Sequence, residues 1–134
     1  MKKYENYCKH LQVFGKAAEQ DLENEFIISG IIDKFFIQFE LGWKLLKELL
    51  KYEGRAAAVT GSPRAIIKEA YITYNFLQED IWLEMLENRN DMAHIYDGGK
   101  ARELADIIIS KYVPEFQTME KSIHDRYGDV LETL

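Results

Sequence analysis

The sequence from Ile28 to Glu53 reads ISGIIDKFFIQFELGWKLLKELLKYE. Its apolar side chains return every three or four residues, the period of an α-helix with one buried face: Ile32, Phe35, Phe36, Phe39, Trp43, Leu46 and Leu50. Gly54 stands where a left-handed C-terminal cap would end the helix. Gly42 lowers helix propensity by about 1 kcal/mol relative to Ala, so it is either a point of close helix approach or a tolerated imperfection. This stretch predicts the strongest helix of the chain.

One further helix is predicted on each side of this stretch. The first carries an apolar stripe at helical spacing: Tyr4, Tyr7, Leu11, Phe14, Ala18 and Leu22. After a loop over residues 55–61, Ser62 and Pro63 supply an N-cap and a first-turn proline. They predict a helix that reaches about Tyr74, with its buried face formed by Ile66, Ile67, Ala70 and Tyr74.

The second half of the chain predicts two more helices. One is capped by Asp80 and carries Trp82, Leu83, Leu86 and, at its end, Arg89. The other runs from about residue 100 to residue 127, with Gly128 at its end. Pro114 should kink or divide it because proline lacks an amide hydrogen. Nothing alternates as a strand would, and the connections are short. We therefore expect an all-α fold, an antiparallel up-and-down bundle of four to five helices, in one domain of residues 1–134.

Composition and charge narrow the classes of function. The 134 residues have a formal net charge of −6, which argues against broad, sequence-independent binding to nucleic acid. A local pocket for a nucleotide or one RNA loop stays open. The single cysteine, Cys8, excludes an internal disulfide, and we expect it to be a small buried hydrophobe. With no secretion signal and no apolar run long enough to cross a membrane, we expect a cytoplasmic protein.

The sequence RNDMAHIY, residues 89–96, concentrates chemistry in eight residues. Arg89 offers a fork of donors for a phosphate, His94 titrates near neutral pH, and Tyr96 offers a phenol that can orient a phosphate. On a straight helix, positions five apart diverge by about 140°, so Arg89 and His94 would face different ways. They converge only if the backbone breaks near the capping residues Asn90 and Asp91, or if a second copy of the chain completes the site.

Other residues near this motif are weaker candidates. Asn90 could add a nucleotide contact beside Arg89. Glu40, Lys44 and Lys47 share one face of the strongest helix, either as a solvated charged stripe or facing the same cleft as Arg89. Each motif residue also has a purely structural interpretation: an ion-paired helix end, a half-buried histidine, a packed tyrosine.

Metal and cofactor chemistry are not expected. The histidines are scattered, and the sequence contains no HExxH, CxxC or P-loop pattern. A nucleotidyltransferase active site needs paired carboxylates on a sheet, so this chain alone should not transfer nucleotides.

Several segments, in order, resemble one family. Residues 31–44 (IIDKFFIQFELGWK) are similar to the "FE…ELaWK" helix of the nucleotidyltransferase substrate-binding proteins, members of the HEPN (higher eukaryotes and prokaryotes nucleotide-binding) superfamily. The similarity continues through residues 61–64, 69–70, 82–86 and 89–97. It implies a helical bundle, usually a homodimer, that partners a minimal nucleotidyltransferase, in many cases as a proposed toxin–antitoxin pair.

In related HEPN toxins the R-x4-H-x-Y motif is the site of a metal-independent ribonuclease, and the partner transferase can add AMP to the tyrosine. The matching residues here are Arg89, His94 and Tyr96. Three hypotheses follow: a partner subunit that binds nucleotide or RNA, an active metal-independent endoribonuclease, and a structural dimerisation adaptor.

Overall fold

The computed structural model describes residues 1–95 and 99–134, and this part of the chain is helical, with no strand. The fold is therefore an all-α helical bundle, as predicted. Its α-helices are α1 (Lys2–Phe14), α2 (Glu25–Tyr52), α3 (Ala57–Thr60), α4 (Pro63–Thr73), α5 (Glu79–Asn90), α6 (Lys100–Ile107) and α7 (Val113–Tyr127). Short 3₁₀ turns cover Ala17–Glu19, Met92–His94 and Gly128–Glu132, and Ile108–Tyr112 form a π-helical segment between α6 and α7.

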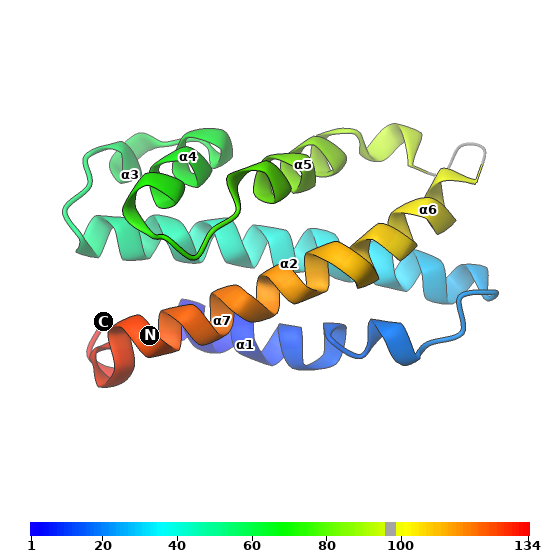
Figure 1. Cartoon of the computed structure of the whole chain (residues 1–134), viewed down its shortest axis with the longest axis horizontal. Coiled ribbons are helices and arrows are strands. Elements are labelled where there is room, and N and C mark those ends of the chain that lie inside the picture. The colour runs from blue at the N-terminus through cyan, green and yellow to red at the C-terminus, as the bar shows by residue number, and fades with distance from the viewer. Residues whose placement is uncertain (96–98) are drawn as a thin grey trace.

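The chain makes four antiparallel passes (Figure 1). Helix α1 leads away from the N-terminus, and the longer helix α2 runs back beside it. Helices α4 and α5 follow one another as the third pass, and α6 and α7 form the fourth. Both termini consequently lie at one end of the bundle, where the amino group of Met1 donates to the carbonyl of Leu131. The 3₁₀ turn of residues 92–94 lies at the other end (Figure 1).

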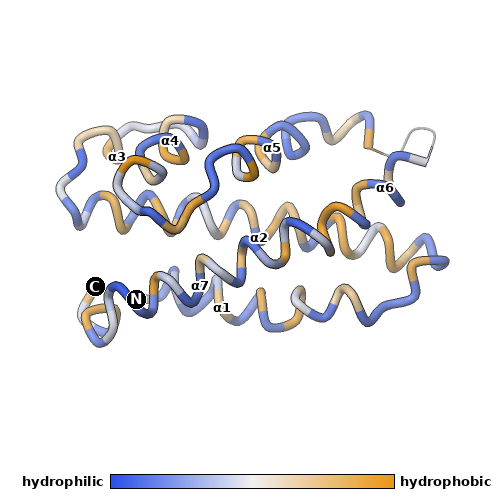
Figure 2. Tube along the Cα trace, viewed as in Figure 1, coloured by the Kyte–Doolittle hydropathy of each residue, from blue (hydrophilic) through white to orange (hydrophobic). Residues whose placement is uncertain are grey.

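Helix α2 is the central element, because it packs against α1, α3, α4, α5 and α6. Its sequence mixes hydrophobic and hydrophilic residues along the whole trace (Figure 2). The buried set contains the predicted Ile32, Phe35, Phe39, Leu46 and Leu50, whereas Phe36 and Trp43 are only half-buried. Their partial exposure follows from their position at the edge of the buried face rather than at its centre.

Gly42 of α2 is a point of close approach. A Cβ atom there would lie 3.0 Å from Cη2 of Trp82 on α5 and 3.3 Å from Cε2 of Tyr7 on α1. Both rings are fully buried. The glycine therefore lets two large aromatic rings pack directly against the α2 backbone. Of the two alternatives that the sequence left open, the structure shows close helix approach.

Two buried polar side chains join the passes. Glu115 of α7 accepts hydrogen bonds from the backbone N–H of Gln78 (3.1 Å), the N-cap of α5, and from Nε1 of Trp82 (3.3 Å). Gln38 of α2 donates to the carbonyl of Tyr7 (3.2 Å). Buried polar groups require such partners, since an unpaired one costs about 1–3 kcal/mol.

Several element boundaries differ from the predicted ones. The first helix ends at Phe14, and a 3₁₀ turn then buries Ala17 in place of Ala18. The predicted loop 55–61 contains the one-turn helix α3. The N-cap of α5 is Gln78, and Asp80 instead lies in the first turn, where its negative charge faces the positive end of the helix dipole. Cys8 is half-buried rather than buried.

The predicted effect of Pro114 is confirmed. Its missing N–H prevents a regular i→i−4 bond, and the preceding residues form the π segment, in which the N–H of Val113 donates to the carbonyl of Ile108. The caps at Ser62, Gly54 and Gly128 are confirmed as well: Ser62 accepts from the N–H of Ala65, and both glycines have positive φ.

Candidate functional site

The backbone breaks where the motif geometry required it. Helix α5 ends at Asn90, Asp91 leaves helical geometry with φ −101° and ψ 27°, and residues 92–94 form a 3₁₀ turn. Arg89 is thus the last-turn cation of α5, while His94 stands beyond the break. The break separates the two side chains into different local environments.

Arg89 lies in a polar cluster that spans two helices, α2 and the end of α5. Its Nε donates to Oε1 of Glu40 at 2.8 Å, and its Nη1 donates to Oδ1 of Asn90 at 3.1 Å. Oε2 of Glu40 accepts from Nε1 of Trp43 at 2.9 Å and lies 3.9 Å from Nζ of Lys44. We call these five residues the Glu40–Arg89 cluster: Glu40, Trp43, Lys44, Arg89 and Asn90.

The Glu40–Arg89 cluster is open to solvent. The side chains of Glu40 and Arg89 are about one-third exposed, and that of Lys44 is 54% exposed. A guanidinium has five N–H donors, and the described residues accept two of those of Arg89. Glu40 therefore fixes the orientation of the guanidinium, and none of the other described residues accepts from its remaining donors.

His94 forms a separate pair. Its Nδ1 lies 2.7 Å from Oδ1 of Asp91, and both side chains are more than 60% exposed. The pair borders a hollow of about 210 Å³ between the end of α5 and α6, whose lining also includes Asn88 and Lys100. A carboxylate on one ring nitrogen orients the imidazole and leaves the other nitrogen for proton transfer.

The structure brings four of the six predicted site residues together: Glu40, Lys44, Arg89 and Asn90. It does not join His94 to them, since among the described residues no hydrogen bond links His94 with Arg89 and Arg89 does not line the hollow beside His94. Tyr96 lies outside the described residues.

Three contributors were missed by sequence reasoning. Asp91 was considered only as a capping residue, although its i,i+3 spacing to His94 indicates a possible pair. Trp43 was assigned to packing, yet its indole N–H holds Glu40. Arg102 had only its i,i+4 spacing to Asp106 as a signal, because its other partners, Leu22 and Glu23, are distant in sequence.

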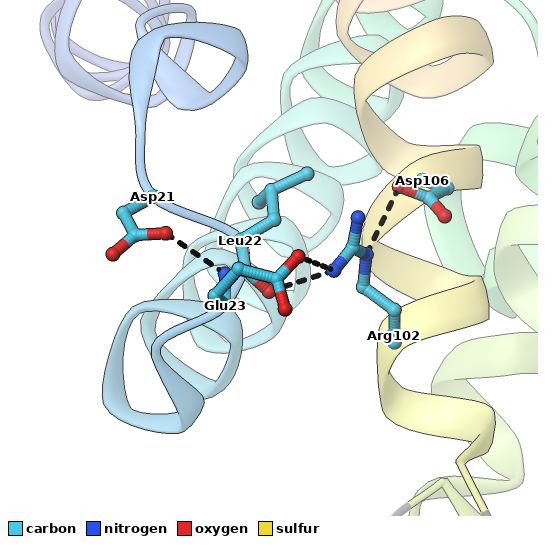
Figure 3. A network of polar contacts seen from close by, with 5 residues as sticks. All are labelled: Asp21, Leu22, Glu23, Arg102 and Asp106. Atoms are coloured by element: carbon cyan, nitrogen blue, oxygen red, sulfur yellow. Dashed lines mark hydrogen bonds and ion pairs between the residues drawn. The ribbon is translucent and has the colours of Figure 1, made fainter.

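Arg102 of α6 secures the connection between α1 and α2 at the motif end of the bundle (Figure 3). Its Nη1 donates to the carbonyl of Leu22 at 2.9 Å and to Glu23 at 3.1 Å, and its Nε donates to Asp106 at 3.4 Å. Asp21 in turn accepts from the N–H of Glu23. This network fixes α6, which lines the hollow beside His94.

Within the described residues, no helix has the length and apolar character needed to cross a lipid bilayer. In the same residues, no group of three or more histidine, cysteine or carboxylate side chains is arranged to hold a metal ion.

Comparison with known proteins gives one result that covers nearly the whole chain. Residues 1–125 match the family described as "Nucleotidyltransferase substrate binding protein like". A comparison with curated proteins gives no match. The matched region contains α1 to α6, the π segment, most of α7 and all the site residues described above, so the chain belongs to the nucleotidyltransferase substrate-binding-like family.

Proposed function

We propose that this chain is the non-transferase subunit that partners a minimal nucleotidyltransferase and binds nucleotide or RNA phosphate at the Glu40–Arg89 cluster. The observation that carries the proposal is the cluster itself. A guanidinium held by Glu40, an exposed ammonium on Lys44 and the amide of Asn90 come together from two helices far apart in sequence. The family name supports the transferase as partner.

The cluster is suited to binding rather than to catalysis by one chain. Arg89 can hold a phosphate with the donors that Glu40 and Asn90 leave available, and Lys44 adds a point charge. Among the described residues, the cluster and its hydrogen-bond partners include no histidine to serve as general acid or base, since His94 is paired with Asp91.

The partnership is tested by co-expressing the chain with the minimal nucleotidyltransferase of the same source. We expect a stable complex in size-exclusion chromatography with light scattering. Two separately eluting proteins at micromolar concentration would contradict the partnership.

Phosphate binding at the cluster is tested by titration calorimetry with ATP, on the chain alone and in the complex. Arg89→Ala should weaken one binding event by about tenfold, because a charge-assisted contact of about 1.4 kcal/mol is lost. The matched control is Arg55→Ala, which removes another exposed arginine from a single ion pair, here with Glu69 at 3.5 Å. Equal affinity in the wild type and Arg89→Ala would refute binding at the cluster.

A metal-independent endoribonuclease is the second candidate, and the His94–Asp91 pair favours it. The carboxylate orients the exposed imidazole, which could accept a proton from an RNA 2′-hydroxyl or return one to the leaving oxygen. Arg89 would stabilise the charge on the transition state. Because the two residues do not share a contact within one chain, we propose a symmetric dimer in which a second copy completes the site.

The ribonuclease proposal predicts cleavage of total RNA in the presence of EDTA, with loss of cleavage in His94→Ala. His124→Ala is the matched control, since His124 is also an exposed histidine close to an aspartate. Intact RNA with the wild type, both alone and after removal of the transferase, would exclude the activity.

The two remaining proposals depend on these results. If cleavage is found, the chain would be the toxin of a toxin–antitoxin pair, with Tyr96 as the AMP acceptor. The structural adaptor expects Arg89 and His94 to lie apart or to be buried without a cleft. They lie in separate contacts, which agrees with the adaptor, whereas the partial exposure of Arg89 and the exposure of His94 support a binding role.

A further inference from the structure

The charge of this protein is distributed unevenly. Residues 1–16 contain four lysines and one acidic residue, Glu5, whereas the other 118 residues contain 13 Lys and Arg against 22 Asp and Glu. The first segment is thus formally +3 in a chain whose total is −6. Since α1 occupies most of this segment, one pass of an acidic bundle is basic.

A large hollow lies along this basic helix. It is an open groove of about 740 Å³ where α1 and α7 lie side by side (Figure 1). We call it the α1–α7 groove. Its volume is within the range of about 300–1,000 Å³ that small-molecule sites occupy. None of the residues that line the groove belongs to the Glu40–Arg89 cluster, so the two are separate.

The charged side chains that line the α1–α7 groove are mostly basic. Lys9 and Lys16 border it from the α1 side, and Lys121 and His124 border it from α7. Of the described residues that line it, Glu120 is the single carboxylate, and burial raises the pKa of that carboxyl. Lys121 is paired with Asp125 at 3.0 Å, but within the described residues Lys9 and Lys16 have no ion-pair partner.

The rest of the lining offers an apolar surface and neutral hydrogen-bonding groups. Leu11 is buried, and Tyr4 and Cys8 are half-buried beside it. Gln12 and Gln117 contribute amides from the two helices, and Gly15 leaves room for the amide of Gln117, which would be 3.2 Å from a Cβ there. This combination of a small apolar wall, amides and unpaired cations suits a ligand with a ring and several phosphates.

We propose that the α1–α7 groove is a second ligand site, which binds the polyphosphate of a nucleoside triphosphate through Lys9 and Lys16. The ammonium groups hold the phosphates as point charges, and the base lies against the half-buried side chains of Tyr4 and Cys8. The site does not depend on the Glu40–Arg89 cluster, and each can fail without the other.

The experiment is titration calorimetry of ATP into the purified chain at low salt. We expect Lys9→Glu/Lys16→Glu to weaken one binding event by at least about tenfold, because two attractions become repulsions. The matched control is Lys2→Glu/Lys68→Glu, which makes the same change of charge at two exposed lysines outside the groove. Lys9→Gln/Lys16→Gln should lose less than the charge reversal, and circular dichroism should show all variants folded.

The outcomes separate the two sites. Binding that survives Arg89→Ala and disappears in Lys9→Glu/Lys16→Glu supports the groove. Binding that disappears in Arg89→Ala and survives the groove variant places the nucleotide at the cluster and overturns this inference alone. No detectable binding of ATP by the wild type overturns it as well, as does AMP binding as tightly as ATP, because the proposal assigns the affinity to the polyphosphate.

Cys8 supplies an independent measurement inside the groove. Burial raises the pKa of its thiol to about 11, so alkylation near pH 9 is slow and easily followed. Saturating ATP should slow the reaction of Cys8 with iodoacetamide by at least about threefold in the wild type and leave the rate unchanged in Lys9→Glu/Lys16→Glu. An equal rate with and without ATP in the wild type would contradict occupation of the groove.

Discussion

Gly42 is a position at which adding one methyl group should destabilise the core. In Gly42→Ala, the new methyl group would lie 3.0 Å from the ring of Trp82 and 3.3 Å from that of Tyr7, both without room to move. Overpacking costs about 1–3 kcal/mol and the gain in helix propensity is about 1 kcal/mol, so we expect a net loss of up to about 2 kcal/mol of unfolding free energy. Gly30→Ala on the same helix is the control: nothing lies within 4 Å, so it should stabilise. Urea denaturation measures both, and a stabilised Gly42→Ala would show that the rings yield.

Glu40 contributes to the arrangement of the site more than to stability. Glu40→Gln removes the charge that pairs with Arg89, but both side chains are about one-third exposed, so we expect a loss of only about 0.5–1 kcal/mol in urea denaturation. ATP should bind the variant more weakly than the wild type, because the guanidinium of Arg89 loses the carboxylate that orients it. Glu69→Gln, at the Arg55 ion pair, is the control for both readouts. Tighter ATP binding in Glu40→Gln would instead show that Glu40 competes with the phosphates for Arg89.

For individual residues, the sequence predicts which side chains belong to the site better than it predicts which of them contact each other. A break near Asn90 and Asp91 was one of two ways in which Arg89 and His94 could converge; the break is present, but it does not bring them together. The partner of Arg89 is 49 residues away, and the i+4 and i+7 spacing of Glu40, Lys44 and Lys47 was equally compatible with a solvated stripe. Only the packing of α5 against α2 decides that Glu40 faces Arg89.

Among the elements, α7 controls how α5 begins. Its residue Glu115 is almost completely buried and accepts from the N-cap N–H of α5 and from Trp82. Burial raises the pKa of Glu115 above its ordinary value of 4.5. The folded state therefore holds the proton more tightly than the unfolded chain, and the contribution of Glu115 to stability falls as pH rises from about 4.5 through the folded-state pKa.

Glu115→Gln should remove this pH dependence, because the amide keeps the acceptor oxygen and has no proton to lose. The stability of the variant relative to that of the wild type should therefore be highest above the folded-state pKa and lowest near pH 4.5. Guanidinium denaturation between about pH 5 and 8 measures the difference, with exposed Glu5→Gln as the control. A difference that is independent of pH would mean that the carboxyl titrates normally.

Element boundaries were predictable only where a residue type forces them. Proline at 114 and glycines at 54 and 128 do so, and their effects are confirmed. The end of α1 was missed because the stripe of apolar residues keeps a three-or-four spacing through the 3₁₀ turn, so periodicity alone does not reveal the break at Gly15. The one-turn helix α3 is too short to have a period.

For the whole molecule, helical periodicity and short connections were sufficient to predict the bundle, because each amphipathic pass can bury its apolar face only against the others. The division of the third pass into α4 and α5 was predicted as well, whereas the groove that α1 and α7 leave between them was not. Grooves depend on the side chains of two passes at once, and a single sequence does not show which side chains meet.

The proposed dimer makes a prediction that depends on symmetry. Within one chain Arg89 and His94 belong to separate contacts, so a catalytic site that uses both must take one from each copy. Light scattering should then give twice the 15.7 kDa mass of the chain. Arg89→Ala and His94→Ala should each be inactive toward RNA, whereas an equimolar mixture should recover about one quarter of wild-type activity.

This fraction follows from the two-fold axis. Half of the dimers in such a mixture contain one copy of each variant, and each of these has one of its two sites intact. If Arg89 and His94 of the same chain act together, the mixed dimers have no intact site and the mixture stays inactive. The activity of Arg89→Ala alone is the baseline. Recovery near one quarter would place the site between two copies, and no recovery with an active wild type would place it within one.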